Sequence, residues 1–107
     1  MEDSLSLKLA ALADPTRRAI VARLAKGEAT VCELQQPFGI SQPAISRHLK
    51  VLETAGLIEQ GRFAQARPRR LRGEALREMS IWFDEVATLW RDSFDRLDAL
   101  LAQDEEG

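Results

Sequence analysis

A cluster of polar and basic side chains near the middle of the chain has the residue types that read the edges of DNA bases. Gln42, Ser46, Arg47 and Lys50 recur at the spacing of one helix face. A Gln amide can pair with adenine, an Arg guanidinium can pair with guanine, and a Ser hydroxyl adapts to either. Pro43 adds only an apolar contact. These residues therefore indicate recognition of double-stranded DNA in its major groove.

Two short helices joined by a tight turn are predicted to present this cluster, over residues 31–55. Thr30 and Glu33 form the pattern of a capping box that opens the first helix. Gly39 supplies the turn, and Ser41 caps the second helix. The free backbone amides at this second start, together with Ser41, suit a phosphate. The apolar positions expected to lock the two helices together are Leu34, Ile40, Ile45, Leu49 and Leu52.

The charge distribution favours the same part of the chain. The net charge is −2, but residues 41–73 hold seven basic and two acidic side chains. Residues 1–40 are balanced, and residues 74–107 hold three basic and ten acidic side chains. A polyanion would therefore meet favourable charge only in the middle segment.

Two strands, residues 57–62 and 66–72, are predicted to follow as a hairpin. Pro68 favours an edge position because it has no N–H to donate. Successive side chains of a strand point to opposite faces, so Arg67, Arg69 and Arg70 cannot all face DNA. We expect Arg69 or Arg70 to pair with an acid of the last helix instead.

The remaining elements are three helices. The first is expected over residues 5–14, and the second begins at Asp14-Pro15 and ends at Gly27, read as a left-handed C′ residue. The third, over residues 74–103, has more apolar residues than one subunit can cover, which indicates a dimer. The residues expected at this interface are Leu5, Leu9, Trp82, Val86, Leu89, Trp90, Phe94, Leu97 and Leu101. Trp82 and Trp90 are alternatively core residues of a monomer or the lining of an effector pocket.

These elements predict a mainly α fold with a small β-hairpin (α+β), a single winged helix-turn-helix domain over residues 1–107. The segments LADPTRRAI (12–20) and SQPAISRHLKVLETAGLIE (41–59), with the basic hairpin after them, resemble the ArsR/SmtB family of winged-helix repressors. The similarity extends over roughly residues 5–100.

The resemblance implies a homodimeric repressor that binds an operator, with an effector relieving repression. The family's DNA contacts carry over to Ser41, Gln42, Ser46 and Arg47, and its wing contacts to Arg62, Gln65 and Arg67. A two-fold dimer would set its recognition helices about 34–36 Å apart, so the operator is expected to be a near-palindrome.

Metal sensing, known in many relatives, is not expected here. Their thiol site uses two cysteines separated by one residue, and this segment contains Cys32 alone. The single histidine, His48, lies within the predicted recognition helix, where we expect a half-buried residue or a phosphate contact. Cys32 is interpreted either as a small apolar residue near a helix start or as a thiolate open to oxidation. No metal and no cofactor are therefore predicted.

The sequence also bears on enzyme activity, on an alternative binding function and on the cellular location. An enzyme is not expected, because the chain has no Gly-rich phosphate loop, no nucleophile beside a base and no suitably placed pair of carboxylates. A winged-helix module that binds an acidic protein without reading DNA is the alternative, although such a surface would carry more aromatic residues. One cysteine, no membrane span and no signal peptide favour the cytoplasm. A small-molecule or redox effector is left open.

Overall fold

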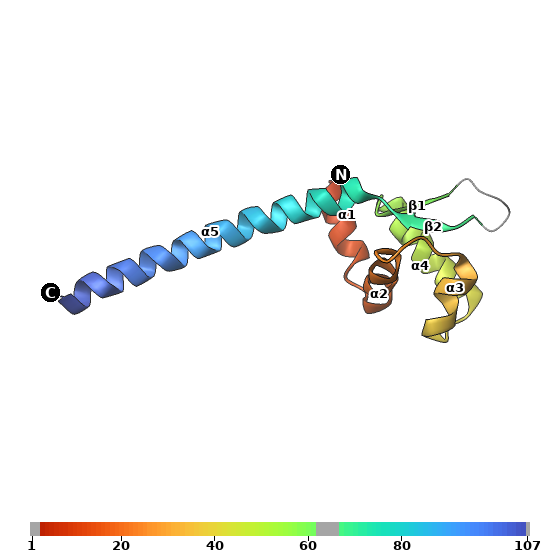
Figure 1. Cartoon of the computed structure of the whole chain (residues 1–107), viewed down its shortest axis with the longest axis horizontal. Helices are drawn as coiled ribbons and strands as arrows, with labels where there is room; N and C mark the ends of the chain where they lie inside the picture. Colours follow the sequence, from red (N-terminus) through yellow and green to blue (C-terminus); the bar gives the residue numbers. More distant parts are fainter. Residues whose placement is uncertain (1–2, 62–66, 107) are drawn as a thin grey trace. The chain divides into compact units, whose positions relative to one another are not determined.

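The computed structural model describes residues 3–61 and 67–106, with residues 104–106 described by their backbone alone. The elements in that part are α1 (Ser4–Ala11), α2 (Pro15–Leu24), α3 (Val31–Gln35), the 3-10 turn η1 (Gln36–Phe38), α4 (Gln42–Thr54), β1 (Ile58–Gln60), β2 (Arg69–Leu71) and α5 (Gly73–Glu106) (Figure 1). The predicted fold class, mainly helical with one small antiparallel hairpin, is confirmed. The chain forms two compact units, Met1–Leu76 and Arg77–Gly107.

Side-chain caps begin the helices at the predicted places. Asp14 accepts a hydrogen bond from the backbone N–H of Arg17 at 3.1 Å, and Pro15 follows it as the first helical residue of α2. An N-cap residue has extended backbone, which Asp14 shows with φ −92° and ψ 129°. Helix α1 therefore ends at Ala11 and does not continue to residue 14 as expected from the sequence.

Two glycines of the first unit differ in their roles. Gly39 adopts φ 62° and ψ 22°, the left-handed conformation, between η1 and α4, as the turn requires. Gly27 was expected to be the left-handed C′ residue of α2, and this expectation is wrong. The C-cap is Ala25, and Gly27 lies two residues further along with φ 146°, outside the left-handed helical region.

The core of the first unit contains side chains from α2, α3, α4 and the start of the hairpin. Leu34 of α3 and Ile20 of α2 are fully buried, as are three residues on one face of α4. The largest buried side chains are Ile20, Leu34, Ile45, Leu49, Leu52, Leu57 and Ile58. Burial of one face of α4 holds that helix so that its opposite face is exposed.

The two strands form an antiparallel hairpin. Its register pairs Ile58 with Leu71, Glu59 with Arg70 and Gln60 with Arg69. Beyond the named strands, the N–H of Gly61 donates to the carbonyl oxygen of Pro68 at 2.7 Å. The strands are shorter than the predicted ranges 57–62 and 66–72 within the described residues.

Helix α5 is continuous over 34 residues and supplies the second unit. From residue 81 to residue 103 every side chain is exposed in the single chain. Across the described ranges, no helix is apolar over a stretch long enough to cross a bilayer.

Candidate nucleic-acid interface

The start of α4 is suited to bind a negatively charged group. The Oγ atom of Ser41 accepts a hydrogen bond from the backbone N–H of Ala44 at 3.2 Å. The remaining N–H groups of a first helical turn have no partner within the helix, and the helix dipole adds positive potential there. Gln42 and Pro43, the first two residues of α4, are exposed. This terminus can therefore receive a phosphate oxygen.

One face of α4 carries the predicted base-reading residues, and all of them are exposed. Ile45, Leu49 and Leu52 are buried on the opposite face. The predicted residues that are exposed on α4 are Gln42, Pro43, Ser46, Arg47 and Lys50. The structure therefore brings the predicted α4 residues together on one accessible helix surface.

Two cations on this face are available to an external anion. Among the residues that the structure describes, Arg47 and Lys50 form no ion pair. Cations without a partner keep their full charge for a polyanion, whereas paired ones are partly neutralised.

Glu53, the one acid within α4, is neutralised by the hairpin. Its Oε1 atom accepts a hydrogen bond from Nε of Arg69 at 2.8 Å and from Nε2 of Gln60 at 3.3 Å. The side chains of Arg69 and Glu53 are 14% and 22% exposed. This contact removes an unfavourable carboxylate charge from the edge of the exposed face and ties the hairpin to α4.

The prediction that Arg69 or Arg70 pairs with an acid of the last helix is wrong. Arg69 pairs with Glu53 of α4, and Arg70 pairs with Glu59 of β1 at 2.8 Å. Arg70 and Glu59 face each other in the strand register, which brings opposite charges together directly. Arg72 also lies 3.9 Å from Glu59.

The helical spacing contained a signal that could have identified Glu53. Residues 42, 46 and 53 lie at i, i+4 and i+11, so they share a face of the helix. An acid on a surface that is predicted to meet a polyanion favours a cation beside it, and the arginines of the following strand were available.

Of the predicted wing residues, Arg67 is described and exposed, with φ 38°. The carbonyl oxygen of Arg67 accepts a hydrogen bond from Nη1 of Arg69. The other two predicted wing contacts, Arg62 and Gln65, lie outside the described residues.

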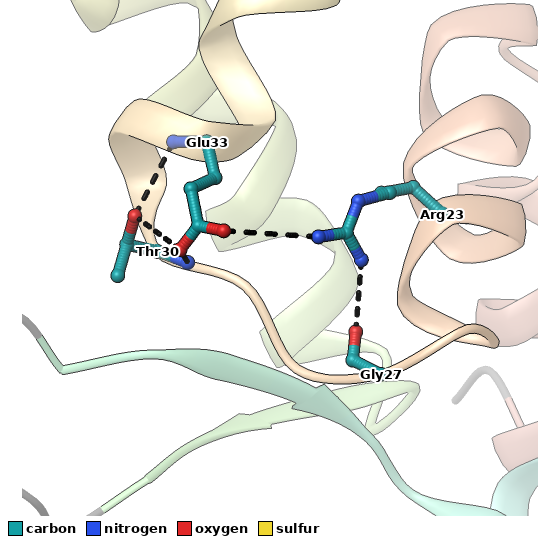
Figure 2. Close-up of polar contacts among 4 residues, drawn as sticks. All are labelled: Arg23, Gly27, Thr30 and Glu33. Carbon is teal, nitrogen blue, oxygen red and sulfur yellow. Dashed lines mark hydrogen bonds and ion pairs between the residues drawn. The ribbon is translucent and has the colours of Figure 1, made fainter.

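Helix α3 is held at its start by side chains from two directions (Figure 2). Thr30 accepts from the backbone N–H of Glu33 at 3.3 Å, and Glu33 accepts from the backbone N–H of Thr30 at 3.2 Å, which completes the predicted capping box. Arg23 of α2 lies 3.8 Å from Glu33 and donates to the carbonyl oxygen of Gly27 at 3.1 Å. These contacts fix α3 against α2, and α3 in turn packs on α4.

Main-chain hydrogen bonds join the segment before α3 to the hairpin. Ala29 and Arg69 exchange two of them, with N···O distances of 3.0 and 2.8 Å. Residue 69 is therefore held through its backbone by Ala29 and through its side chain by Glu53.

The carboxyls that cap α2 and α3 have lowered pKa values. The pKa of Asp14 is lowered chiefly because its carboxylate accepts the backbone N–H of Arg17. The pKa of Glu33 is lowered by its hydrogen bonds from Thr30, with a smaller contribution from the charge of Arg23. Both shifts report caps that favour the ionised form.

The two residues considered for metal or redox chemistry lie apart from any ligand cluster. His48 is half-buried, and its Nδ1 atom lies 3.4 Å from Nη1 of Arg17. Cys32 is exposed and lies near the start of α3, as expected from the sequence, and its exposure leaves both interpretations of this residue open. Within the described part of the chain, no three His, Cys, Asp or Glu side chains gather to hold a metal ion.

The predicted interface residues of α5 are exposed in the single chain. Trp82, Trp90 and Phe94 are among them, with the indole of Trp90 and the ring of Phe94 in an edge contact at 5.1 Å between centroids. The other exposed ones are Val86, Leu89, Leu97 and Leu101. Leu5 and Leu9 of α1, also predicted for the interface, are half-buried in the first unit. A large apolar helix surface is thus left for another molecule to cover.

Three packed helices, the turn before α4 and the adjoining hairpin define a winged helix-turn-helix protein. The family model described as "Bacterial regulatory protein, arsR family" matches residues 14–60. A crystal structure of an ArsR family transcriptional regulator, RHA00566, is 36% identical with a TM-score of 0.76 and covers 83% of this chain and 98% of its own. The chain belongs to the ArsR family of bacterial regulatory proteins, which are not enzymes.

Two further relatives show how much of the chain is similar to known proteins. The HTH-type transcriptional regulator Rv2034 of Mycobacterium tuberculosis is 60% identical over 48 residues, which are 45% of each chain. The chain thus matches less than half the length of that relative. The homodimeric winged helix-turn-helix DNA-binding domain of Mb0332 from Mycobacterium bovis is 28% identical with a TM-score of 0.66, covering 80% of each chain.

Proposed function

We propose that this chain is a homodimeric transcriptional repressor that inserts α4 into the major groove of a near-palindromic operator. The observation that carries the proposal is the exposed face of α4, where Gln42, Ser46, Arg47 and Lys50 lie beside a helix start capped by Ser41. The side chains offer hydrogen bonds to base edges, and the helix start offers amide donors to a phosphate. Repression as the sign of regulation is what the family resemblance implies.

The wing is proposed to make contacts beside the recognition helix. Arg67 is exposed and available for a phosphate or a narrow minor groove. Arg62 and Gln65 complete the proposed wing set. Arg69 acts by holding the hairpin against α4 and does not itself face DNA, because its guanidinium is engaged with Glu53.

Dimerisation is proposed to occur through α5, with Leu5 and Leu9 of α1 contributing. The apolar side chains of α5 recur eleven residues apart, as Phe83 with Phe94, Val86 with Leu97 and Leu89 with Leu100. An eleven-residue repeat corresponds to 3.67 residues per turn and keeps one stripe facing a partner helix. The homodimeric state of the Mycobacterium bovis neighbour supports the same arrangement here. The dimer is proposed to act in the cytoplasm.

Selection of bound sequences from a random duplex pool tests the proposal. We expect two related half-sites with centres about 10–10.5 base pairs apart, or a multiple of that spacing, because a two-fold dimer presents two copies of α4. An enriched single half-site would exclude the symmetric dimer. A pool without enrichment, combined with capture of acidic proteins by residues 41–73, would support the alternative of a protein-interaction module.

A further inference from the structure

A hollow of about 340 Å³ lies among α1, α2 and α4, within the first unit. Leu7 and Ala10 of α1 and Val51 of α4 give it an apolar wall. Arg17 of α2 and Lys50 of α4 are the charged residues of its lining. Its volume is at the lower end of the range of about 300–1,000 Å³ that is typical of small-molecule sites.

The Arg17 guanidinium is held in place by two contacts and still has N–H groups that can donate to a ligand. Its Nε atom donates to the carbonyl oxygen of Ala11 at 2.6 Å, and its Nη1 atom lies 3.4 Å from Nδ1 of His48. A guanidinium has five N–H donors, and these two contacts use two of them. Lys50, among the described residues, has no carboxylate within ion-pair distance.

The charged side chains that line the hollow are all positive. The residues that surround the hollow include two cations, a threonine and apolar side chains, and no Asp or Glu is among them. Arg17 already has the carbonyl oxygen of Ala11 and the charge of Asp14 nearby, whereas Lys50 has no ion-pair partner among the described residues. A neutral apolar molecule would therefore partly desolvate Lys50 without compensation, and a cation would be repelled. An anion with an apolar body satisfies both parts of the lining.

We propose that this hollow binds a small monocarboxylate with an aliphatic or aromatic body. The body lies against Leu7, Ala10 and Val51, and the carboxylate accepts hydrogen bonds from Arg17 and Lys50. Lys50 also belongs to the exposed face of α4, so the bound carboxylate neutralises a charge that would otherwise meet a phosphate. This consequence for DNA rests on the proposed function, whereas the binding step does not.

Binding of octanoate to the full chain without DNA tests the site. We expect saturable binding in calorimetry, with the largest amide shifts in NMR spectra at Ala10, Val51 and Thr54. The alcohol 1-octanol, which has the same apolar body without the charge, is expected to bind much more weakly. Equal binding of octanoate and 1-octanol, or no octanoate binding, would overturn the proposal.

Two variants locate the binding. Lys50→Met keeps the apolar stem and removes the charge, and it is expected to weaken octanoate binding about 3–10-fold. Ala10→Leu fills the hollow and is expected to abolish saturation. The control Lys26→Met removes an exposed cation that is absent from the lining, and binding should stay within about twofold. Unchanged octanoate affinity in both Lys50→Met and Ala10→Leu would place the ligand elsewhere and contradict the proposal.

The remaining outcomes separate this site from the proposed function. If octanoate affinity falls as the protein concentration rises, a second copy of the chain occupies the hollow and the proposal fails. If octanoate binds but no duplex is selected, the site stands and the proposed function fails. If the operator binds and octanoate weakens it in the parent chain but not in Ala10→Leu, both are supported.

Discussion

The Nε atom of Arg69 on β2 donates a 2.8 Å hydrogen bond to Oε1 of Glu53 near the end of α4. The two residues are 16 positions apart in the chain, and their side chains are largely buried. The same arginine exchanges two backbone hydrogen bonds with Ala29. Arg69 therefore connects the hairpin, helix α4 and the segment that precedes α3.

This connection predicts a measurable coupling between the two side chains. Arg69→Met and Glu53→Gln are each expected to lower the free energy of unfolding, and the double variant to lose less than the sum. We expect a coupling energy of about 1 kcal/mol, within the range of 0.5–3 kcal/mol for contacting residues. Urea unfolding at one fixed protein concentration measures it, because dimer stability depends on concentration.

The ion pair between Arg70 and Glu59 is the matched control for that cycle. Its N···O distance is also 2.8 Å, but its side chains are 56% and 42% exposed. An exposed pair is screened by water, so the coupling from Arg70→Met and Glu59→Gln should be below about 0.5 kcal/mol. Equal coupling in the two cycles would show that burial does not strengthen the Arg69 contact.

Local rules of helix starts and apolar spacing predicted much of the first unit. Asp14, Thr30 and Ser41 cap the helices that the sequence assigned to them, since a cap involves residues only three positions apart. Ile45, Leu49 and Leu52 are buried as their spacing predicted. The exposed face of α4 follows directly from that burial.

Contacts between residues that are far apart in the sequence could not be predicted in the same way. The partner of Arg69 depends on the strand register and on how the hairpin returns past α4, and neither is contained in local spacing. Charge sign predicted that an arginine needed an acid, but not which acid.

Replacement of Arg47 tests the proposal that the exposed face of α4 reads DNA bases. Arg47→Ala should weaken operator binding by about 1–3 kcal/mol if the guanidinium contacts a guanine in bidentate fashion, and base preference at that position should relax. If it contacts a phosphate instead, the slope of log K against log salt should fall by about 0.9 with little change in preference. Fluorescence anisotropy on the selected operator and on single-base variants distinguishes the two results.

Arg91→Ala is the control for that measurement. Arg91 is also an exposed arginine within a helix, and its Nε atom donates to the carbonyl oxygen of Ala87 at 3.3 Å. It lies in α5, among acidic residues, so operator affinity and salt slope should remain at the parent values. Parent affinity in Arg47→Ala would contradict the assignment of this face.

A charge placed on the apolar stripe of α5 should separate the proposed dimer. Trp90 is 65% exposed in the single chain, so Trp90→Glu is not expected to disturb the fold of a monomer. In a dimer it would bury an unpaired carboxylate, which costs about 3–5 kcal/mol and raises the dissociation constant more than about 100-fold. Sedimentation equilibrium measures this constant. Thr88→Glu adds the same charge on the opposite side of the helix and should leave the dimer intact, whereas dimers that persist in Trp90→Glu would exclude this stripe as the interface.

Acid should weaken the fold through the carboxyls that cap its helices. The pKa values of Asp3, Asp14 and Glu33 are all lowered in the folded chain, first of all by backbone hydrogen bonds. Because the folded pKa lies below the unfolded one, the stabilisation is complete above the ordinary values of 3.8 and 4.5 and is lost as pH falls through the folded pKa. The urea midpoint should therefore begin to fall below about pH 4.5 and continue to fall past pH 3.8. Glu33→Gln keeps an acceptor oxygen without a titrating group, so its midpoint should depend less steeply on pH, and a slope identical to that of the parent would remove Glu33 from this account.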